Sequence, residues 1–255
     1  MKQCLIVDLG LVEYSAAWEL QRRLVAGRKL GAIPDVLLLC EHPHVITLGR
    51  NGKLANLRVS DHILHQMGVS FFETDRGGDI TYHGPGQLVG YPIVNLAEIR
   101  RDVAWYVRGL EEAMIRATAE FGILSKRVSG RTGVWVDVEK ENEVVEVQDV
   151  KEMKEEEKLA AIGVHLSRWV TSHGFAYNVS TDLRYFDLIV PCGIAGKRAT
   201  SLEKVLGRRV EVKEVAPRIA AHFADIFGLD LHANDPGVLN AMLQPLEERT
   251  ALAAV

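Results

Sequence analysis

Short apolar runs alternate along the chain with segments whose apolar residues recur every three or four positions. The short runs predict strands at 5–9, 36–40, 45–48, 69–73, 80–82, 88–94, 133–137 and 158–166. The periodic segments predict helices at 14–30, 61–67, 102–120, 202–206 and in a last stretch with Pro217 in its first turn and Gly228 past its end. Segment 169–179 is typical of a strand pair or bend. Without regular βαβ alternation, the pattern predicts a single α/β or α+β domain.

Composition limits the classes of partner. The 255 residues are 47% hydrophobic and 25% charged, with a net charge of −4, so no overall basic surface favours nucleic acid. No apolar run approaches the roughly 18 residues of a membrane span, and the start is too short and too quickly acidic for a signal peptide. Three widely spaced cysteines argue against both a disulfide framework and a metal site. We therefore expect a cytoplasmic protein with no metal, nucleic-acid or membrane partner.

Two segments depart from the pattern of the main domain. Glu139–Glu157 holds nine acidic residues against three lysines, which predicts a solvated hairpin tip between two strands. After Leu231 the sequence becomes polar and rich in alanine, which we interpret as a surface appendage. The expected division is thus a main domain at 1–230, with an acidic insert at 139–157, and a C-terminal tail at 231–255.

A glycine-rich stretch, Arg76–Leu88, has the composition of a ligand-binding loop. Its glycines permit backbone conformations closed to other residues and a close approach to a ligand, while Arg76, Asp79 and His83 supply polar side chains. A buried strand follows directly, and loops anchored on core strands carry many substrate sites. The local sequence leaves open a plain glycine-rich hairpin.

Cys192 is the candidate nucleophile. Cys4 and Cys40 lie in apolar strands, where cysteine behaves as a small hydrophobe. Cys192 instead stands between a proline and a glycine, with Lys197 and Arg198 close behind, and nearby cations favour the reactive thiolate. An inert loop cysteine is the alternative.

A thiol nucleophile also needs a partner that holds it ionised or accepts its proton. His83, His165 and His173 are the histidine candidates. Lys158 starts an apolar strand, so its ammonium can enter a partly desolvated site where its pKa falls. A surface lysine that ends the acidic run is the simpler interpretation of Lys158.

Four motifs, in this order along the chain, resemble the lipoyl(octanoyl) transferase family. Four linked motifs are far more specific than one glycine-rich loop, and the resemblance covers roughly residues 5–228. The acidic insert is longer than the family's usual hairpin connection but leaves Lys158 in frame. The motifs are Arg76–Leu88, Lys158–Gly163, His173–Val179 and the segment from Pro191–Cys192–Gly193 to Thr200–Ser201–Leu202.

The resemblance implies the fold of biotin and lipoate protein ligases, a mixed sheet flanked by helices. It implies transfer of an octanoyl or lipoyl group, without a cofactor, from acyl carrier protein to a lysine of the lipoyl domains of 2-oxoacid dehydrogenase and glycine cleavage complexes. Cys192 would carry the acyl thioester, and Lys158 would lower its pKa and handle the proton. The pocket would be lined by Arg76, Gly77, Gly78, Asp79, Ile80, Thr81, Tyr82, His83, Ala161, Ile162, Gly163, Gly174, Phe175 and Ala176.

These residue types suit such a reaction. Thiol and thioester exchange at little cost in free energy, so no ATP is needed, and the amide product lies downhill. Dividing the transfer into two steps is the usual gain from covalent catalysis. We expect backbone N–H donors for the oxyanion near Cys192 or at Gly77–Gly78.

Three alternatives remain. An ATP-dependent lipoate or biotin protein ligase would share the fold but needs no cysteine at 192. A non-catalytic acyl-binding protein would not need both Lys158 and Cys192. A papain-like hydrolase would carry a cysteine signature that this sequence lacks.

Overall fold

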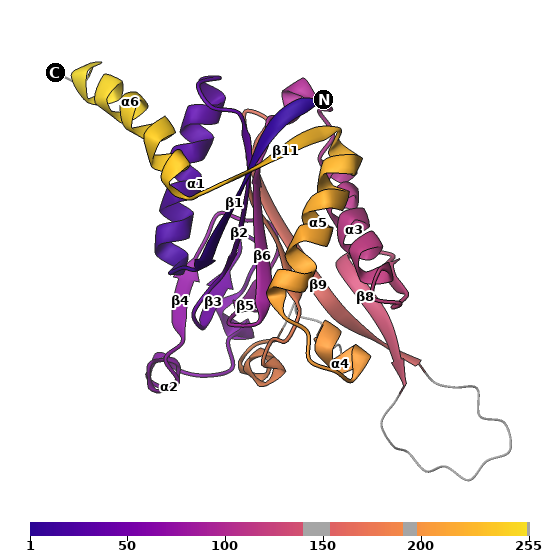
Figure 1. The fold of residues 1–255 in the computed structure, drawn as a ribbon. Coiled ribbons are helices and arrows are strands. Elements are labelled where there is room, and N and C mark those ends of the chain that lie inside the picture. The colour runs from indigo at the N-terminus through magenta and orange to yellow at the C-terminus, as the bar shows by residue number, and fades with distance from the viewer. Residues whose placement is uncertain (140–153, 191–197, 254–255) are drawn as a thin grey trace, which may run out of the picture.

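The computed structural model describes residues 1–139, 154–190 and 198–253 (Figure 1). A large mixed sheet runs in the order β11-β1-β2-β6-β10-β9-β8-β7, and a small sheet in the order β4-β3-β5. β1 pairs in parallel with β2 and β11, and the other neighbours in the large sheet are antiparallel. The strands are β1 Lys2–Leu11, β2 Asp35–Glu41, β3 Val45–Leu48, β4 Ser70–Glu73, β5 Ile80–His83, β6 Gln87–Ile93, β7 Ser125–Val128, β8 Arg131–Glu139, β9 Lys154–Ser167, β10 Val170–Asn178 and β11 Leu229–Asn234.

Helices cover both faces of the large sheet (Figure 1). α3 and α5 bury Tyr106, Leu110 and Phe223 in one core cluster, and α1 and α6 bury Leu24 and Leu239 in another. The mixed sheet flanked by helices confirms the expected fold class. The longer helices are α1 Tyr14–Lys29, α3 Val103–Ala119, α5 Val212–Phe227 and α6 Gly237–Ala253, and the short ones are α2 Asp61–Gln66, α4 Leu202–Leu206 and the 3-10 turns η1 Leu54–Asn56, η2 Leu96–Glu98 and η3 Leu183–Leu188. Within the described ranges, no helix has the length and apolarity to cross a membrane.

The start of α5 differs from the expectation. The helix begins at Val212, because Glu211 and Glu214 form a reciprocal capping box around its first turn. Pro217 therefore lies in the second turn, where its missing N–H costs one helical hydrogen bond. Gly228 ends the helix in the left-handed conformation, as expected.

The segment expected as a strand pair or bend is one strand, β10. The reversal comes earlier, because Arg168 and Trp169 both have positive φ (51° and 66°) and form a two-residue turn between β9 and β10. His173 also has a positive φ, 54°, yet its pairing with Val164 is uninterrupted. The strand pair or bend expected within 169–179 was therefore wrong.

The segment after Leu231 is more than a surface appendage. β11 pairs with β1 from Lys2↔Leu229 onward, and Leu239 and Leu243 of α6 are 1% and 2% exposed within the core. The alanine-rich composition of this segment does not indicate that Leu239 and Leu243 are buried. The division of the chain at residue 230 stays a prediction.

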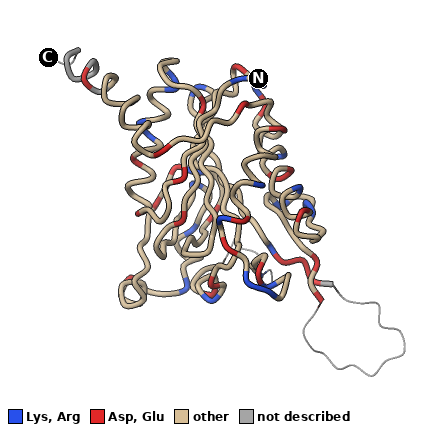
Figure 2. Tube along the Cα trace, in the orientation of Figure 1, with Lys and Arg blue, Asp and Glu red and all other residues tan. Residues whose placement is uncertain are grey.

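β8 and β9 form an antiparallel pair out to Glu139↔Lys154, so residues 154–157 of the expected insert belong to β9. Figure 2 shows acidic positions on both strands where they lead to the undescribed segment. Residues 140–153, which include most of the insert, lie outside the described residues.

We expect the insert to be dispensable for folding. Because Glu139 and Lys154 are paired, an Asn-Gly turn in place of residues 140–153 closes the hairpin in a favoured geometry. Thermal unfolding should stay within experimental error of the wild type, and so should the acylation of Cys192 that the family resemblance implies. A selective loss of transfer to the lipoyl-domain acceptor that the resemblance also implies would show instead that the insert docks a partner.

Candidate active site

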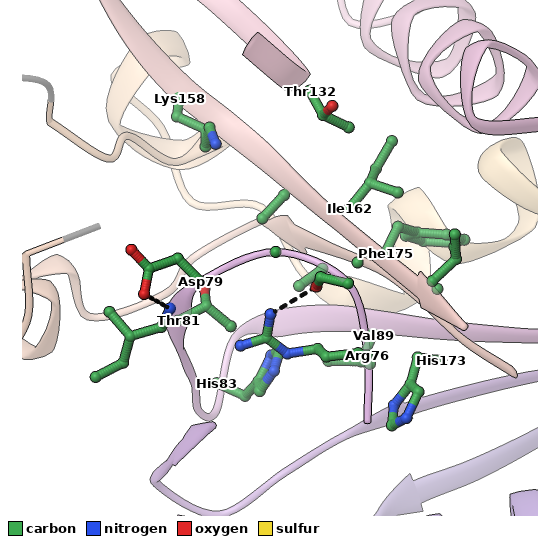
Figure 3. A pocket seen from close by; sticks show the side chains of 18 of the residues that line it. Arg76, Asp79, Thr81, His83, Val89, Thr132, Lys158, Ile162, His173 and Phe175 are labelled. Atoms are coloured by element: carbon green, nitrogen blue, oxygen red, sulfur yellow. Dashed lines mark hydrogen bonds between the residues drawn. The ribbon is translucent and has the colours of Figure 1, made fainter. Parts of the chain in front are cut away.

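A cavity of about 550 Å³ lies between the glycine-rich loop and strands β9 and β10. Lys158 lines it, and so does every residue expected in the pocket except Tyr82. Figure 3 shows Lys158 at the upper left and His173 at the lower right of the cavity, with Asp79 and Thr81 at the lower left. The expected residues that line the cavity are Arg76, Gly77, Gly78, Asp79, Ile80, Thr81, His83, Ala161, Ile162, Gly163, Gly174, Phe175 and Ala176.

Backbone hydrogen bonds fix the glycine-rich loop on two sides. The N–H groups of Arg50 and Asn51 donate to the carbonyls of Arg76 and Gly78, at 3.0 and 3.1 Å. On the other side, the Gly77 N–H donates to the Val164 carbonyl of β9 at 2.9 Å. This bond occupies the Gly77 N–H, which removes it from the expected oxyanion donors.

Gly163 permits that close approach. A Cβ atom at residue 163 would lie 2.7 Å from the Gly77 carbonyl oxygen, closer than real Cβ contacts allow. The glycine therefore serves the packing of the loop against β9, rather than free space for a ligand.

Arg76 is a buried cation in the cavity wall, only 7% exposed. Its Nη2 donates to the Thr47 carbonyl at 2.6 Å and to Thr47 Oγ1 at 3.0 Å, and its Nε donates to the same hydroxyl at 3.1 Å. The guanidinium thus ties the loop to β3, so its orientation is fixed before any ligand binds.

His83 is a neutral imidazole and only a weak base. Burial, with nearby His42 and Arg76, lowers its pKa to about 3. The amide nitrogen of Gln87 donates to Asn178 Oδ1, so Gln87 Oε1 faces His83 Nδ1 at 2.7 Å and accepts its proton. The ring is therefore a structural donor at neutral pH.

His165 and His173 both lie against Asp75. His173 Nε2 is 2.7 Å from Asp75 Oδ1, and His165 Nε2 is 3.6 Å from Oδ2. The hydrogen bond from His173 is the main cause that lowers the pKa of Asp75 to about 2, and burial lowers the pKa of His165. These two histidines thus form a cluster away from Lys158 (Figure 3 shows this for His173).

Lys158 is half-buried at the cavity edge. Its Nζ lies 4.8 Å from the ring centroid of Trp135, the cross-strand neighbour on β8, which is a cation–π distance. Its backbone accepts from the Thr200 N–H and donates to the Arg198 carbonyl, both at 2.9 Å. Lys158 is therefore not the solvated end of the acidic run.

Cys192 lies outside the described residues, within segment 191–197. The described residues on either side of that segment are both anchored beside the cavity. Val190 donates its N–H to the Asn56 carbonyl at 2.7 Å, and the backbone carbonyl of Arg198 accepts from the Lys158 N–H at 2.9 Å. Asn56 in turn donates to the Asp79 carboxylate at 2.7 Å.

Tyr82 points to the opposite face of β5 from Thr81 and His83, because side chains alternate along a strand. It is fully buried, its hydroxyl lies 2.7 Å from His44 Nδ1, and its ring stacks on Tyr185 at 5.1 Å. Tyr82 is not among the described residues that line the cavity. Its place in the pocket is not supported.

Sequence reasoning missed several aromatic members of the cavity wall. Tyr14 opens α1, Tyr91 lies on β6, and Trp135 lies on β8. Aromatic residues at helix and strand positions have the signature of ordinary core, so no local signal marks them. Only the β8–β9 register, which brings Trp135 opposite Lys158, reveals its role.

The described residues gather no group of three or more histidine, cysteine, aspartate or glutamate side chains suited to a metal ion.

The fold resembles that of two lipoate protein ligases of known structure. The fold matches a bipartite lipoate protein ligase from an archaeal lipoylation system of Thermoplasma acidophilum, with a TM-score of 0.70 over 96% of this chain and 92% of that one at 14% identity. It also matches a lipoate-protein ligase A bound with ATP, with a TM-score of 0.69 over 96% and 94% at 14% identity. Residues 13–224 fit the family model of the lipoyl protein ligase A/B catalytic domain.

Similar sequences narrow the assignment. The octanoyltransferase of Solibacter usitatus is 52% identical over 91% of this chain and 96% of that protein, and that of Koribacter versatilis is 51% identical over 87% and 83%. The chain belongs to the octanoyltransferase family of lipoyl protein ligase A/B catalytic domains, and it is an acyltransferase of protein lipoylation.

Proposed function

We propose that this protein transfers an octanoyl group from acyl carrier protein to a lysine of a lipoyl domain through a thioester on Cys192. The observation that carries the proposal is the cavity, in which the three segments 76–83, 161–163 and 174–176 meet beside Lys158. Relatives about half identical in sequence are octanoyltransferases, which supports the transferase over a ligase that activates a free acid.

The Cys192 thiolate would attack the carbonyl carbon of the donor thioester. The bond to the carrier's sulfur breaks, and the carrier leaves as a thiol with a proton supplied by Lys158. In the second half, the amine of the acceptor lysine attacks the enzyme thioester, the Cys192 thiolate leaves, and neutral Lys158 takes up the surplus proton. Lys158 thus ends as it began, and the two steps balance.

The cavity suits an acyl chain of medium length. Its volume of about 550 Å³ falls in the range of small-molecule sites, and Phe175, Ala176 and Val89 provide apolar walls. The Gly77 N–H is occupied, so the oxyanion donors are expected from Gly78 or from the backbone near Cys192.

The acceptors would be lipoyl domains of 2-oxoacid dehydrogenase and glycine cleavage complexes, in the cytoplasm. Cys4 and Cys40 are free buried thiols, which is consistent with a reducing compartment.

The test is intact-mass analysis of the purified protein. Incubation with octanoyl-acyl carrier protein, without ATP, should add one octanoyl group, and a lipoyl domain added later should remove it and gain the same mass on its lysine. A protein that modifies the lipoyl domain only with free octanoate and ATP would be a ligase, contrary to the proposal.

A further inference from the structure

A second cavity, of about 440 Å³, adjoins the first cavity, which we call the acyl cavity. The second cavity has no role in the proposed chemistry. α1, the turn between β9 and β10, and Asp75 surround it. The two cavities share no lining residue among those described. Residues of the protein therefore separate the two cavities.

The boundary falls at one residue pair of the sheet. On β9 the acyl cavity is lined as far as Val164, and the next residue, His165, lines the second cavity. On β10, His173 lines the acyl cavity while its neighbour Ser172 lines the second. Val164 pairs with His173, and His165 pairs with Ser172, so the change occurs between two adjacent rungs.

The same boundary crosses the two segments that lie over these strands. In the glycine-rich loop, Arg76 lines the acyl cavity and Asp75 the second one. On α1, Tyr14 lines the acyl cavity and Trp18, one turn later, lines the second. In all four segments, the residues that line the acyl cavity give way to residues that line the second cavity at the same position along the strands.

The side chains of His173 and Asp75 meet at that level. His173 is 2% exposed, and its Nε2 is 2.7 Å from Asp75 Oδ1. Its backbone N–H donates to Gln21 Oε1 of α1 at 2.8 Å, so strand, loop and helix are joined at one point. Its φ of 54° lies in the left-handed region, where a residue with a Cβ is strained. Such strain persists where the surroundings fix a side chain in place.

We propose that the Asp75–His173 pair is the end wall of the acyl cavity and sets the longest acyl chain that the enzyme accepts. The inference rests on the proposed acyl transfer and names its substrate class, acyl groups of medium length. His173 acts here as a specificity-determining residue and takes no part in proton transfer.

The wall excludes longer chains for two reasons. A methyl end that pushed past His173 would break its hydrogen bond to the Asp75 carboxylate and leave the buried imidazole without this partner. Beyond the wall, the acyl chain would meet Lys29 and Arg168, which both line the second cavity. Contact with hydrocarbon would desolvate these charged side chains, which is unfavourable. The chain is therefore stopped at the imidazole.

His173→Gly tests the wall with little risk to the fold, because glycine adopts a positive φ without strain. The measurement is the rate of acyl-enzyme formation, by intact mass, with octanoyl-, decanoyl- and dodecanoyl-carrier proteins. The dodecanoyl-to-octanoyl rate ratio should rise by about tenfold or more, the scale on which pockets discriminate single methylene groups. His173→Asn, shorter than histidine and tolerant of positive φ, should give a smaller rise.

His165→Ala is the matched control, because it removes the other imidazole near Asp75 but lies wholly on the second-cavity side. Its length profile should equal that of the wild type. Folding of each variant is checked by thermal unfolding.

The outcomes separate the two proposals. A wild type that forms no octanoyl-enzyme overturns the proposed function itself. A wild type that forms it, with unchanged length profiles in both His173 variants, overturns the end wall alone. An equal shift in His165→Ala also overturns it, because removal of either imidazole would then act through general loosening.

Discussion

Cys192→Ser takes up no octanoyl mass from octanoyl-acyl carrier protein under conditions that fully acylate the wild type. A hydroxyl is far less ionised than a thiol at neutral pH, and loss of the nucleophile in comparable enzymes costs several orders of magnitude in rate. We expect transfer to the lipoyl domain to fall by about a thousandfold or more. The measurement is intact mass followed by peptide mapping of the wild-type adduct.

Cys4→Ala is the control for this prediction. Cys4 and Cys40 are buried, and desolvation raises the pKa of both thiols well above its usual value, so neither is a competent nucleophile. Cys4→Ala should therefore acylate normally. An octanoyl adduct mapped to Cys4 or Cys40 in the wild type would remove Cys192 from the mechanism.

Lys158→Ala should shift the reaction of Cys192 with iodoacetamide to higher pH and slow acyl transfer far more than it weakens donor binding. At about 4 Å and an effective dielectric near 20, a pair of unit charges is worth on the order of 4 kcal/mol before desolvation. A third of that moves the midpoint of alkylation by about one pH unit. The sign is upward, because the cation favours the thiolate and its removal favours the thiol.

Lys158→Arg separates charge from proton transfer. Arginine keeps the positive charge but does not release its proton, so it should restore part of the low-pH alkylation and little of the turnover. Lys204→Ala is the matched control, since its Nζ pairs with Glu157, the residue before Lys158, at 3.2 Å. Identical alkylation profiles for wild type, Lys158→Ala and Lys158→Arg would exclude Lys158 as the partner of the thiol.

The sequence predicted which segments line the cavity better than it predicted the edges of the fold. The segments around Arg76, Ala161 and Gly174 belong to motifs with unusual composition, and they do meet in one cavity. β11 and α6 have no such composition. They hold their places through pairing with β1 and through a few buried leucines, and both depend on distant parts of the chain.

The histidines illustrate the second limit of the sequence. His83, His165 and His173 were equally plausible bases, because an imidazole shows its partners only in three dimensions. In the structure, His83 is kept neutral by burial and the other two face Asp75. Tyr82 failed as a pocket residue for a similar reason, since the motif that contains it says nothing about which face of β5 each side chain takes.

The parallel pairing of β1 with β11 has a consequence for synthesis on the ribosome. β1 is made first, yet its outer neighbour is made only after nearly all the rest of the domain. During that interval one side of β1 exposes unpaired N–H and C=O groups, which other nascent chains can use as a template. Premature termination before Leu229 leaves this edge open permanently. Shortened products should thus accumulate in aggregates rather than as partly active enzyme.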